Sequence, residues 1–296
     1  MKKSSFVVGL VGLTLVSSSA FAQDAGTEAA PAEGSEAAPA EAAPAEAAPA
    51  DSSAAPAADV GGQSYKGVPI EIIDRPRALP KGLMQLGGDL AIARTSVTVA
   101  GKTTSSTGAA LGLSFGYGVA DKLVVGVAYG FALKEFEAKG DLRLNAAYAF
   151  MENSREAKMS AAATVGLGYS ILGESLDPIE LGVDFHYKLT PKMELFSGGG
   201  QLQIGIDPNT TASLNLPVGF GFQASPKLWA SAETNLATIG LKPSGSTLIG
   251  RDSTPISLAA YYSPSAQLDV GASFHTVDLG GVADAFSIVF SGRYRM

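Results

Sequence analysis

The stretch Leu123-Val124-Val125-Gly126-Val127-Ala128-Tyr129-Gly130-Phe131-Ala132-Leu133 decides the fold. Its odd-numbered positions carry only large apolar side chains, whereas its even-numbered positions carry Gly, Ala and one Val. Successive side chains of a strand point to opposite faces, so a period of two predicts a β-strand. This strand would have one bulky face and one small face.

The same alternation returns throughout the stretch from Leu83 to Met296. Bulky apolar residues hold every second position in the runs 111–117, 142–150, 159–171, 181–189, 214–222, 256–262, 268–274 and 286–296, with an occasional Ala or Gly. One run changes parity, because Met193 and Leu195 are odd-numbered whereas Leu202 and Ile204 are even-numbered. A β-bulge in Gly198–Gly200 would shift the register in this way.

The composition of the second face distinguishes a membrane barrel from a soluble one. Alternation alone also fits a soluble sandwich or a lipocalin-like barrel, which would carry bulky residues inside and charged residues outside. Here the second face consists of Gly, Ser, Ala and Asn with scattered charges. We therefore expect this face to line a water-filled or loosely packed lumen, and the bulky face to contact lipid.

The spacing of the turns predicts the number of strands. Five short polar connections recur, namely 120–122, 152–156, 190–192, 225–227 and 263–265. Between them lie six other connections, at 94–108, 134–140, 172–178, 207–211, 240–250 and 277–282. Together they predict an all-β fold, a transmembrane antiparallel up-and-down β-barrel of twelve strands, with ten or fourteen as alternatives. Helical spans fit poorly because the uncharged stretches are rich in Gly and alternate with period two.

Aromatic residues on the bulky face mark one rim of this barrel. One precedes each short turn and another lies near the chain end: Tyr117, Phe150, Tyr187, Phe222, Tyr262 and Tyr294. Tyrosine favours the lipid headgroup level, where its ring contacts hydrocarbon and its hydroxyl contacts water. We predict an aromatic girdle at the periplasmic interface, the side on which both termini would lie.

The first 63 residues have a different composition. Residues 1–22 resemble a secretory signal, with Lys2 and Lys3, an apolar run and the cleavage pattern Ala20-Phe21-Ala22. Residues 23–63 form an Ala-, Pro- and Glu-rich segment with eight acids and no base, which we expect to be a disordered periplasmic linker. Without these acids and the two signal lysines, the 28 acids and 21 bases of the chain become 20 and 19, so residues 64–296 are nearly neutral.

Residues 64–82 join this linker to the barrel at 83–296. Pro69, Pro76 and Pro80 make a long helix improbable, so we expect an extended lead-in. The lead-in either packs against the domain that follows, enters the lumen as a plug, or serves as a motif for a periplasmic partner.

The alternating strands and the signal peptide resemble those of bacterial outer-membrane β-barrels. Ile288, Phe290 and Tyr294 share one parity, as in the C-terminal assembly signal of that class, although Met296 replaces the usual terminal aromatic. The segment Asp74-Arg75-Pro76 followed by Leu79-Pro80-Lys81-Gly82 is similar to the lead-in of an uncharacterised, porin-like group. The resemblance implies outer-membrane lipid and the barrel-assembly machinery as partners, and the tail adds a periplasmic or cell-wall contact.

The composition argues against most site chemistry. The absence of Cys excludes disulfides, thiol nucleophiles and Cys-based zinc sites, and two His leave little for a metal centre. A formal charge of −7 argues against nucleic acid as a partner. We expect no cofactor and no enzymatic activity.

The small face supplies the candidate functional residues. Polar and charged side chains expected to line the lumen are Asp89, Arg143, Asn145, Glu180, Asp184, His186, Lys188, Gln201, Gln203, Asn215, Glu233, Asn235, Asp269, His275 and Arg293. Such a mixed lining suits a passive channel for small hydrophilic solutes with weak ion selectivity. A structural outer-membrane protein with an acidic periplasmic spacer is the alternative. A lipid hydrolase that uses Ser273 and His275 is a second alternative.

Overall fold

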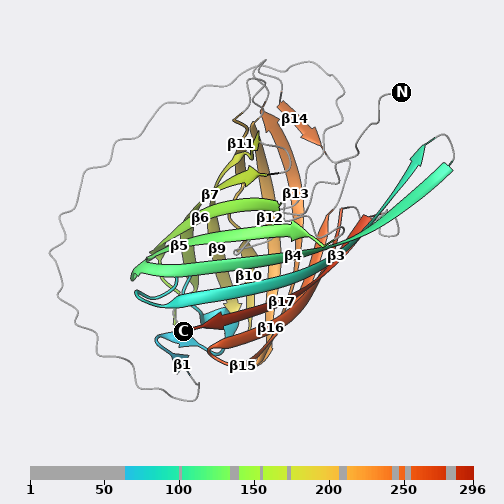
Figure 1. Cartoon of the computed structure of the whole chain (residues 1–296). Coiled ribbons are helices and arrows are strands. Elements are labelled where there is room, and N and C mark those ends of the chain that lie inside the picture. The colour runs from blue at the N-terminus through green and yellow to red at the C-terminus, as the bar shows by residue number, and fades with distance from the viewer. Residues whose placement is uncertain are drawn as a thin grey trace, which may run out of the picture. The chain divides into compact units, whose positions relative to one another are not determined.

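The computed structural model describes residues 64–99, 102–133, 140–153, 156–171, 175–206, 212–241, 247–250, 255–277 and 285–296. The expected signal peptide and acidic linker lie outside these ranges. Within them the strands form one closed antiparallel ring of twelve, which confirms the predicted fold class (Figure 1). Among the described residues, no helix is long and apolar enough to span a membrane.

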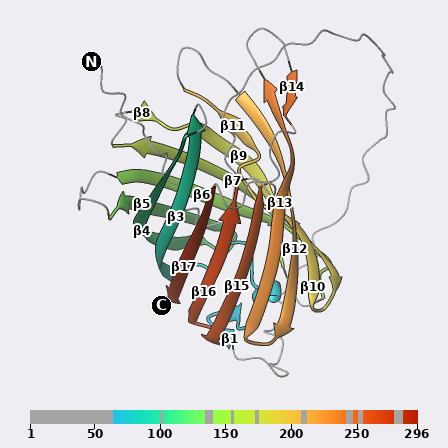
Figure 2. The same cartoon turned by 90° about the vertical axis from the view of Figure 1, so that its right-hand side faces the viewer.

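The ring follows the order of the chain. Its strands are β3 (Met84–Val99), β4 (Lys102–Ala120), β5 (Leu123–Ala132), β6 (Gly140–Met151), β7 (Met159–Ser170), β9 (Ile179–Thr190), β10 (Met193–Ser197) with β11 (Leu202–Ile204), β12 (Ala212–Ser225), β13 (Leu228–Leu241), β15 (Ile256–Ser265), β16 (Leu268–Thr276) and β17 (Ala285–Arg295). Figure 2 shows β13, β15, β16 and β17 side by side along one wall. The ring closes where β17 pairs with β3, from Ala285 opposite Thr95 to Arg295 opposite Gln85.

Five shorter elements accompany the ring in the described part of the chain. β8 (Ser175–Leu176) pairs with β7, and β14 (Thr247–Gly250) pairs with β13. The lead-in, residues 64–82, contains a small hairpin of β1 (Ser64–Tyr65) and β2 (Val68–Pro69), followed by the 3-10 helix η1 (Ile72–Asp74). We call the end of the barrel with short turns the turn end, and the opposite end the loop end.

The parity change near Gly198–Gly200 is a bulge in the seventh strand. Ser197 of β10 pairs with Phe185 and Leu202 of β11 pairs with Leu181, so five steps on one strand oppose four on the other. Gln201 bridges the gap, because its side-chain amide accepts a hydrogen bond from Val183 N and donates one to Val183 O, both at 2.7 Å. One extra residue therefore moves the next apolar set back to the outer face.

The bulky face of the strands points outward, as the alternation predicts. Leu113, Leu144, Tyr148 and Phe290 are each about half exposed, with exposed fractions from 50% to 52%. Soluble monomers rarely leave so many large apolar side chains on one continuous surface. A barrel placed in hydrocarbon has this arrangement, because closure satisfies every backbone group and the outer side chains meet lipid.

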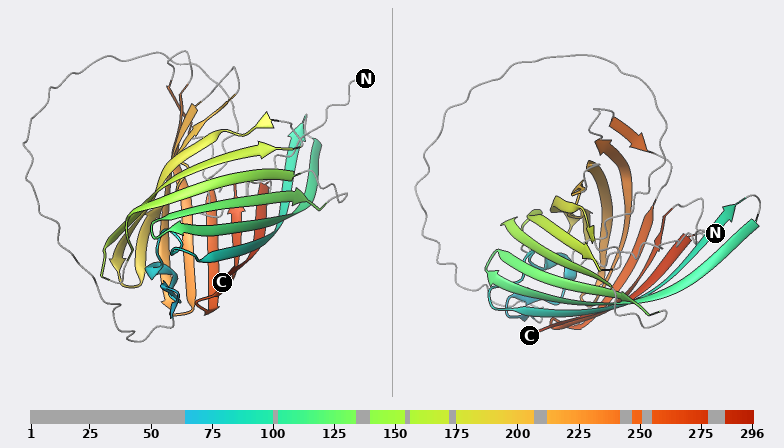
Figure 3. Two further views of the ribbon diagram at one scale, coloured as in Figure 1. Left: turned by 60° about the vertical axis from the view of Figure 1, so that its left-hand side comes forward. Right: turned by 45° about the horizontal axis from the view of Figure 1, so that its top comes forward.

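Two connections differ from the sequence prediction. Residues 94–108 were expected to form a loop, but β3 and β4 pair through most of them and extend beyond their neighbours as a hairpin (Figure 3). The residues there are mostly Thr, Ser and Val, of which the β-branched Thr and Val favour strands, and the hydroxyls of Ser96 and Ser105 form a hydrogen bond at 2.9 Å. The turn expected at 263–265 lies instead at 266–267, because β15 has a register shift between Tyr262 and Ser265.

Candidate functional site in the barrel lumen

The barrel encloses a cavity of about 510 Å³. Eleven of the fifteen residues proposed from the sequence line it: Asp89, Arg143, Asn145, Glu180, Asp184, His186, Glu233, Asn235, Asp269, His275 and Arg293. They come from both halves of the ring and carry both signs of charge. Several of them are paired across strands; for example, Arg143 of β6 forms an ion pair with Glu180 of β9.

The other four residues make local contacts and do not line the cavity. Lys188 is buried in an ion pair, and Gln201 bridges the bulge described above. Asn215 accepts a hydrogen bond from Thr238 at 2.8 Å, beside a register shift between β12 and β13. Gln203 lies opposite Glu180 in the sheet, and therefore on the same face of the wall.

The lead-in occupies the turn end of the lumen. Its side chains Val68, Ile70 and Ile73 are between 1% and 4% exposed, and Ala78 packs against Ala147, Ala149 and Ala162 of the barrel wall. Complete burial of a Val or Ile side chain stabilises by about 1.5–3 kcal/mol. The lead-in therefore packs against the inner wall of the barrel, inside the lumen. Of the alternatives that the sequence left open, the structure shows packing against the domain that follows.

Arg75 anchors the lead-in to the wall. Its guanidinium donates two hydrogen bonds to Asp269 of β16, at 2.8 and 2.9 Å, and one to the Ser263 hydroxyl at 3.1 Å. It also donates to the carbonyl oxygens of Pro69 and Ile70, which fixes the fold of the lead-in itself. Burial lowers the pKa of Arg75 to about 10 while Asp269 opposes the shift, so the guanidinium stays charged at neutral pH.

Asp269 is shared between the lead-in and the barrel. Arg295 of β17 donates to it at 2.6 Å and Ser263 donates to it at 2.7 Å, in addition to the contacts from Arg75. The carboxylate is 2% exposed, so its charge is compensated by two arginines rather than by water. Removal of Arg75 would leave Asp269 paired, whereas removal of Asp269 would leave two buried cations facing one another.

Further contacts hold the lead-in at other points of the ring. Asp74 accepts an ion-paired hydrogen bond from Lys188 of β9 at 2.7 Å, and Arg77 donates to His186 of the same strand at 2.8 Å. Asn153, after β6, donates to the carbonyl oxygens of residues 73 and 75, and Gln223 of β12 accepts from Ile73 N at 3.3 Å. The lead-in therefore contacts strands on opposite sides of the turn end.

Small wall residues provide the space for the lead-in. Leu79 lies against Gly116, and the backbone of Pro80 lies so close to Gly118 that an added Cβ would overlap its carbonyl oxygen. Gly118 also exchanges backbone hydrogen bonds with Gly82 and Leu83. The expectation of a water-filled or loosely packed lumen is therefore wrong at the turn end, where the lead-in packs against the small face.

The single tryptophan, Trp229, lies in a row of aromatic side chains that crosses β10, β13 and β15. The ring centroid of Trp229 is 6.4 Å from that of Phe196 and 6.0 Å from that of Tyr261, and His186 stacks on Phe196 at 5.3 Å. Trp229 is 9% exposed, and its Nε1 has no hydrogen-bond partner among the residues that the structure describes. Trp229 is the second residue of β13, near the turn end.

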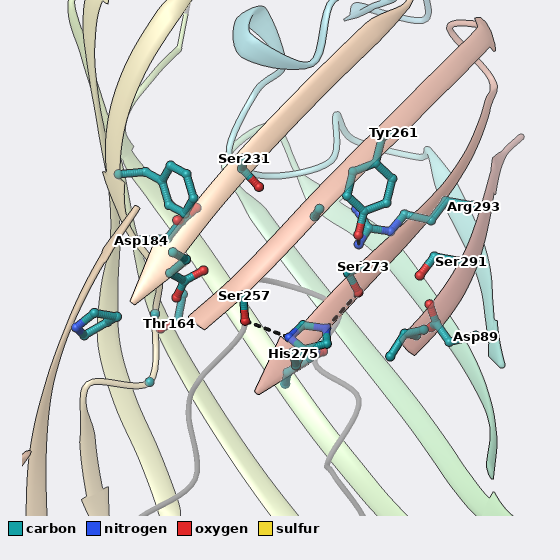
Figure 4. Close-up of a pocket in the computed structure, with 18 of the residues that line it drawn as sticks. Asp89, Thr164, Asp184, Ser231, Ser257, Tyr261, Ser273, His275, Ser291 and Arg293 are labelled. Atoms are coloured by element: carbon teal, nitrogen blue, oxygen red, sulfur yellow. Dashed lines mark hydrogen bonds between the residues drawn. The ribbon is translucent and has the colours of Figure 1, made fainter. Parts of the chain in front are cut away.

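The second histidine is bonded to two serines in the lumen (Figure 4). His275 Nδ1 lies 2.7 Å from Ser257 Oγ, and Nε2 lies 2.7 Å from Ser273 Oγ. A neutral imidazole has one N–H, so one serine donates to the ring and the other accepts from it. In the same view, Arg293 lies beside Tyr261, with the guanidinium carbon 5.1 Å from the ring centroid.

The six aromatic residues proposed as a girdle lie near the turn end on the outer face. Their exposed fractions range from 37% to 48%. Each follows the parity of the lipid-facing positions on its strand. Their role as an interfacial girdle stays a prediction.

Comparisons with known proteins find similarity in structure but none in sequence. No protein-family description matches the chain, and no curated protein matches it by sequence. The COG4313 outer membrane channel from Pseudomonas putida F1 aligns with a TM-score of 0.47 and 17% identity over 74% of this chain and 97% of its own. A KdgM porin aligns with a TM-score of 0.46 and 8% identity over 70% and 98%, and Omp33 of Acinetobacter baumannii with a TM-score of 0.38 and 13% identity over 73% and 100%.

The closed twelve-stranded ring and its apolar outer surface decide the fold class. The protein is a closed antiparallel β-barrel with an apolar outer surface. In this barrel the strands enclose a cavity that charged, polar and apolar side chains line, and the lead-in contributes to that lining from the turn end. The sequence could not indicate the residues that hold the lead-in. Ser263 bonds to Arg75, which lies 188 positions away, and Arg295 bonds to Asp269, which lies on another strand.

Proposed function

We propose that the protein forms a passive channel for small hydrophilic solutes in the outer membrane, with its periplasmic mouth narrowed by the lead-in. The observation that carries this proposal is the lumen cavity of about 510 Å³ lined by polar side chains of both signs. Paired charges such as Arg143 with Glu180 favour weak ion selectivity over strict exclusion of one sign. The turn end would face the periplasm, together with the acidic tail.

The test is single-channel conductance of the full mature chain in planar bilayers. Wild type should give discrete steps, and a variant with a loosened lead-in, Arg75→Ala with Gly118→Ala, should give larger steps because these residues seat the lead-in. A sealed bilayer with both proteins would refute the channel. Equal conductance of the two would refute the narrowing of the mouth.

The filled mouth also favours a second candidate, a structural protein that carries an acidic spacer. The linker joins the lead-in directly at Ser64, so the wall contacts of Arg75 and Asp74 would bear any load placed on the tail. Deletion of residues 24–63 should then weaken the cell envelope and leave conductance unchanged. An intact envelope in that strain would remove this candidate.

We propose no enzymatic role. The serine–histidine contacts at His275 lie on the lumen wall, away from the acyl chains that a lipid hydrolase must reach. Both ring nitrogens bond to serine hydroxyls, whereas an efficient serine nucleophile uses a histidine oriented by a carboxylate. Ester cleavage by the purified barrel that is lost in His275→Ala would contradict this proposal.

We further propose two partners for the remaining features. The C-terminal strand β17, which closes the ring against β3, would be recognised by the barrel-assembly machinery, and outer-membrane lipid would surround the apolar belt. Met296 exchanges two backbone hydrogen bonds with Met84, both at 3.0 Å, so the last residue takes part in closure. Replacement of Tyr294 or Phe290 by Ser should lower the yield of assembled barrel in cells.

A further inference from the structure

The Nε2 atom of His186 lies near one hydrogen-bond donor and one acceptor, which require different protonation states of this nitrogen. Nε2 lies 2.8 Å from Nη1 of Arg77, which belongs to the lead-in, and 3.1 Å from Oδ1 of Asp184, which belongs to the wall. A guanidinium can only donate, so Arg77 needs Nε2 without a proton. A carboxylate can only accept, so Asp184 needs Nε2 with a proton. The two hydrogen bonds exclude each other.

The other ring nitrogen serves both states. Nδ1 lies 3.0 Å from Oε2 of Glu194, a side chain that is 1% exposed, and donates to it whether the ring is neutral or charged. Phe196 stacks on the imidazole and limits its rotation. The proton on Nε2 is therefore the one variable, and it decides whether His186 bonds to the lead-in or to the wall.

The charged groups around the imidazole belong to three elements. Asp184 and Lys188 lie on its own strand β9, Glu194 lies on β10, and Arg77 lies on the lead-in, with Asp74 of the lead-in bound to Lys188. The two wall carboxylates favour the imidazolium, whereas Arg77 opposes it. A charged His186 would place two cations at hydrogen-bond distance, because the guanidinium of Arg77 carries a positive charge.

We propose that His186 is the pH sensor of a latch that holds the lead-in in the turn end of the lumen. Neutral His186 accepts from Arg77 and keeps the lead-in seated. When Nε2 is protonated, it donates its hydrogen bond to Asp184 instead. The charged ring then repels Arg77, and the lead-in loosens. This latch would regulate the channel proposed above, although seating of the lead-in can be measured in a protein that conducts nothing.

The size of the response follows from the number of protons. One proton changes the ratio of seated to released lead-in by at most about tenfold per pH unit, as in any single-site linkage. The Arg75–Asp269 and Asp74–Lys188 pairs persist, so acid weakens the seating without abolishing it. The response should occur in the histidine range and level off below it.

Trp229 provides a reporter that does not depend on conductance. It is the only tryptophan of the chain and is 9% exposed. Its neighbour across the strands, Gln223, accepts a hydrogen bond from the lead-in, and its other neighbour, Tyr261, lies two positions from the Arg75 partner Ser263. Release of the lead-in would expose the indole to a small neutral quencher such as acrylamide.

The experiment compares wild type and His186→Gln in lipid vesicles, with acrylamide quenching of Trp229 followed from about pH 7.5 to about pH 5, a window that spans ordinary histidine titration. Gln can accept from Arg77 at every pH in this range. Wild type should show stronger quenching in acid, with the change centred on one titration, and His186→Gln should stay unchanged. His275→Gln, which alters the lumen histidine away from the lead-in, should keep the wild-type response.

Three results separate the possibilities. Quenching of wild type that does not change with pH, or a response of His186→Gln as steep as that of wild type, overturns the latch. If His186→Gln fails to assemble, Arg77→Met replaces it, since loss of the cation should also remove the pH response. Silent bilayers together with pH-dependent quenching would overturn the channel and leave the latch standing.

Discussion

Loss of the Arg75 side chain should release the lead-in and leave the barrel intact. Arg75→Ala removes two charge-assisted bonds to Asp269, one bond to Ser263 and two bonds that fold the lead-in. Asp269 keeps Arg295 and Ser263 as partners, so no orphaned carboxylate adds to the loss. Hydrogen bonds to charged groups contribute about 1.5–3 kcal/mol each, but they are coupled here, and we expect a net loss of about 2–3 kcal/mol.

The assay uses the absence of cysteine from the chain. Val68 is 2% exposed in the lead-in, and Val68→Cys introduces one thiol of similar size that only reacts when the lead-in leaves its seat. When opening is fast relative to labelling, the rate follows the open population, so a loss of 2–3 kcal/mol should accelerate labelling by about 30- to 150-fold. Lys81→Ala, which removes an exposed cation from the same segment, is the matched control and should label at the parental rate.

Two outcomes would refute this reasoning. Labelling of Arg75→Ala within twofold of the parent would show that Arg75 does not anchor the lead-in. Equal loss of thermal stability of the whole barrel in Arg75→Ala and Asp269→Asn would show that the two residues form one structural unit. We expect Asp269→Asn to be the more damaging, because Arg75 and Arg295 would then face each other without their carboxylate.

Three further predictions concern the wall. Gly118→Ala should accelerate the same thiol labelling without unfolding the barrel, because the added methyl would overlap the carbonyl oxygen of Pro80. Gln201→Ala should lower the free energy of unfolding by about 1–3 kcal/mol in urea titrations, because the backbone at the bulge loses its side-chain partner. Leu144→Lys should destabilise the barrel in lipid by about 2–4 kcal/mol, whereas Asn145→Lys on the adjacent lumen position should shift ion selectivity and leave stability nearly unchanged.

The strands and their orientation could be predicted because they obey a local rule. A period of two is visible within any run such as 123–133, and hydrocarbon fixes which face is bulky. The bulge at Gly198–Gly200 was also predictable, since Leu195 and Leu202 differ in parity. The hairpin at 94–108 was mistaken for a loop because polar β-branched residues suit both an exposed strand and a connection.

The anchoring of the lead-in could not be predicted because it depends on contacts distant in the sequence. Arg75 and Asp269 lie 194 positions apart, and nothing near either residue indicates the other. Asp269 was placed among the lumen residues from its parity alone. The small size of Ala147 and Gly118 was apparent, but a small residue can face water or another part of the chain, and the alternation does not distinguish the two.

The small face of the strands therefore has two roles: it lines the cavity, and it makes room for the lead-in. It lines a cavity together with charged side chains, and at the turn end it leaves room for the backbone and apolar side chains of the lead-in. A channel that needed only a wide mouth would not require Gly118 to fit the backbone of Pro80, nor an alanine cluster around Ala78. The fit of these residues, together with ionic contacts on separate strands, favours a lead-in that occupies a defined seat and leaves it as a unit.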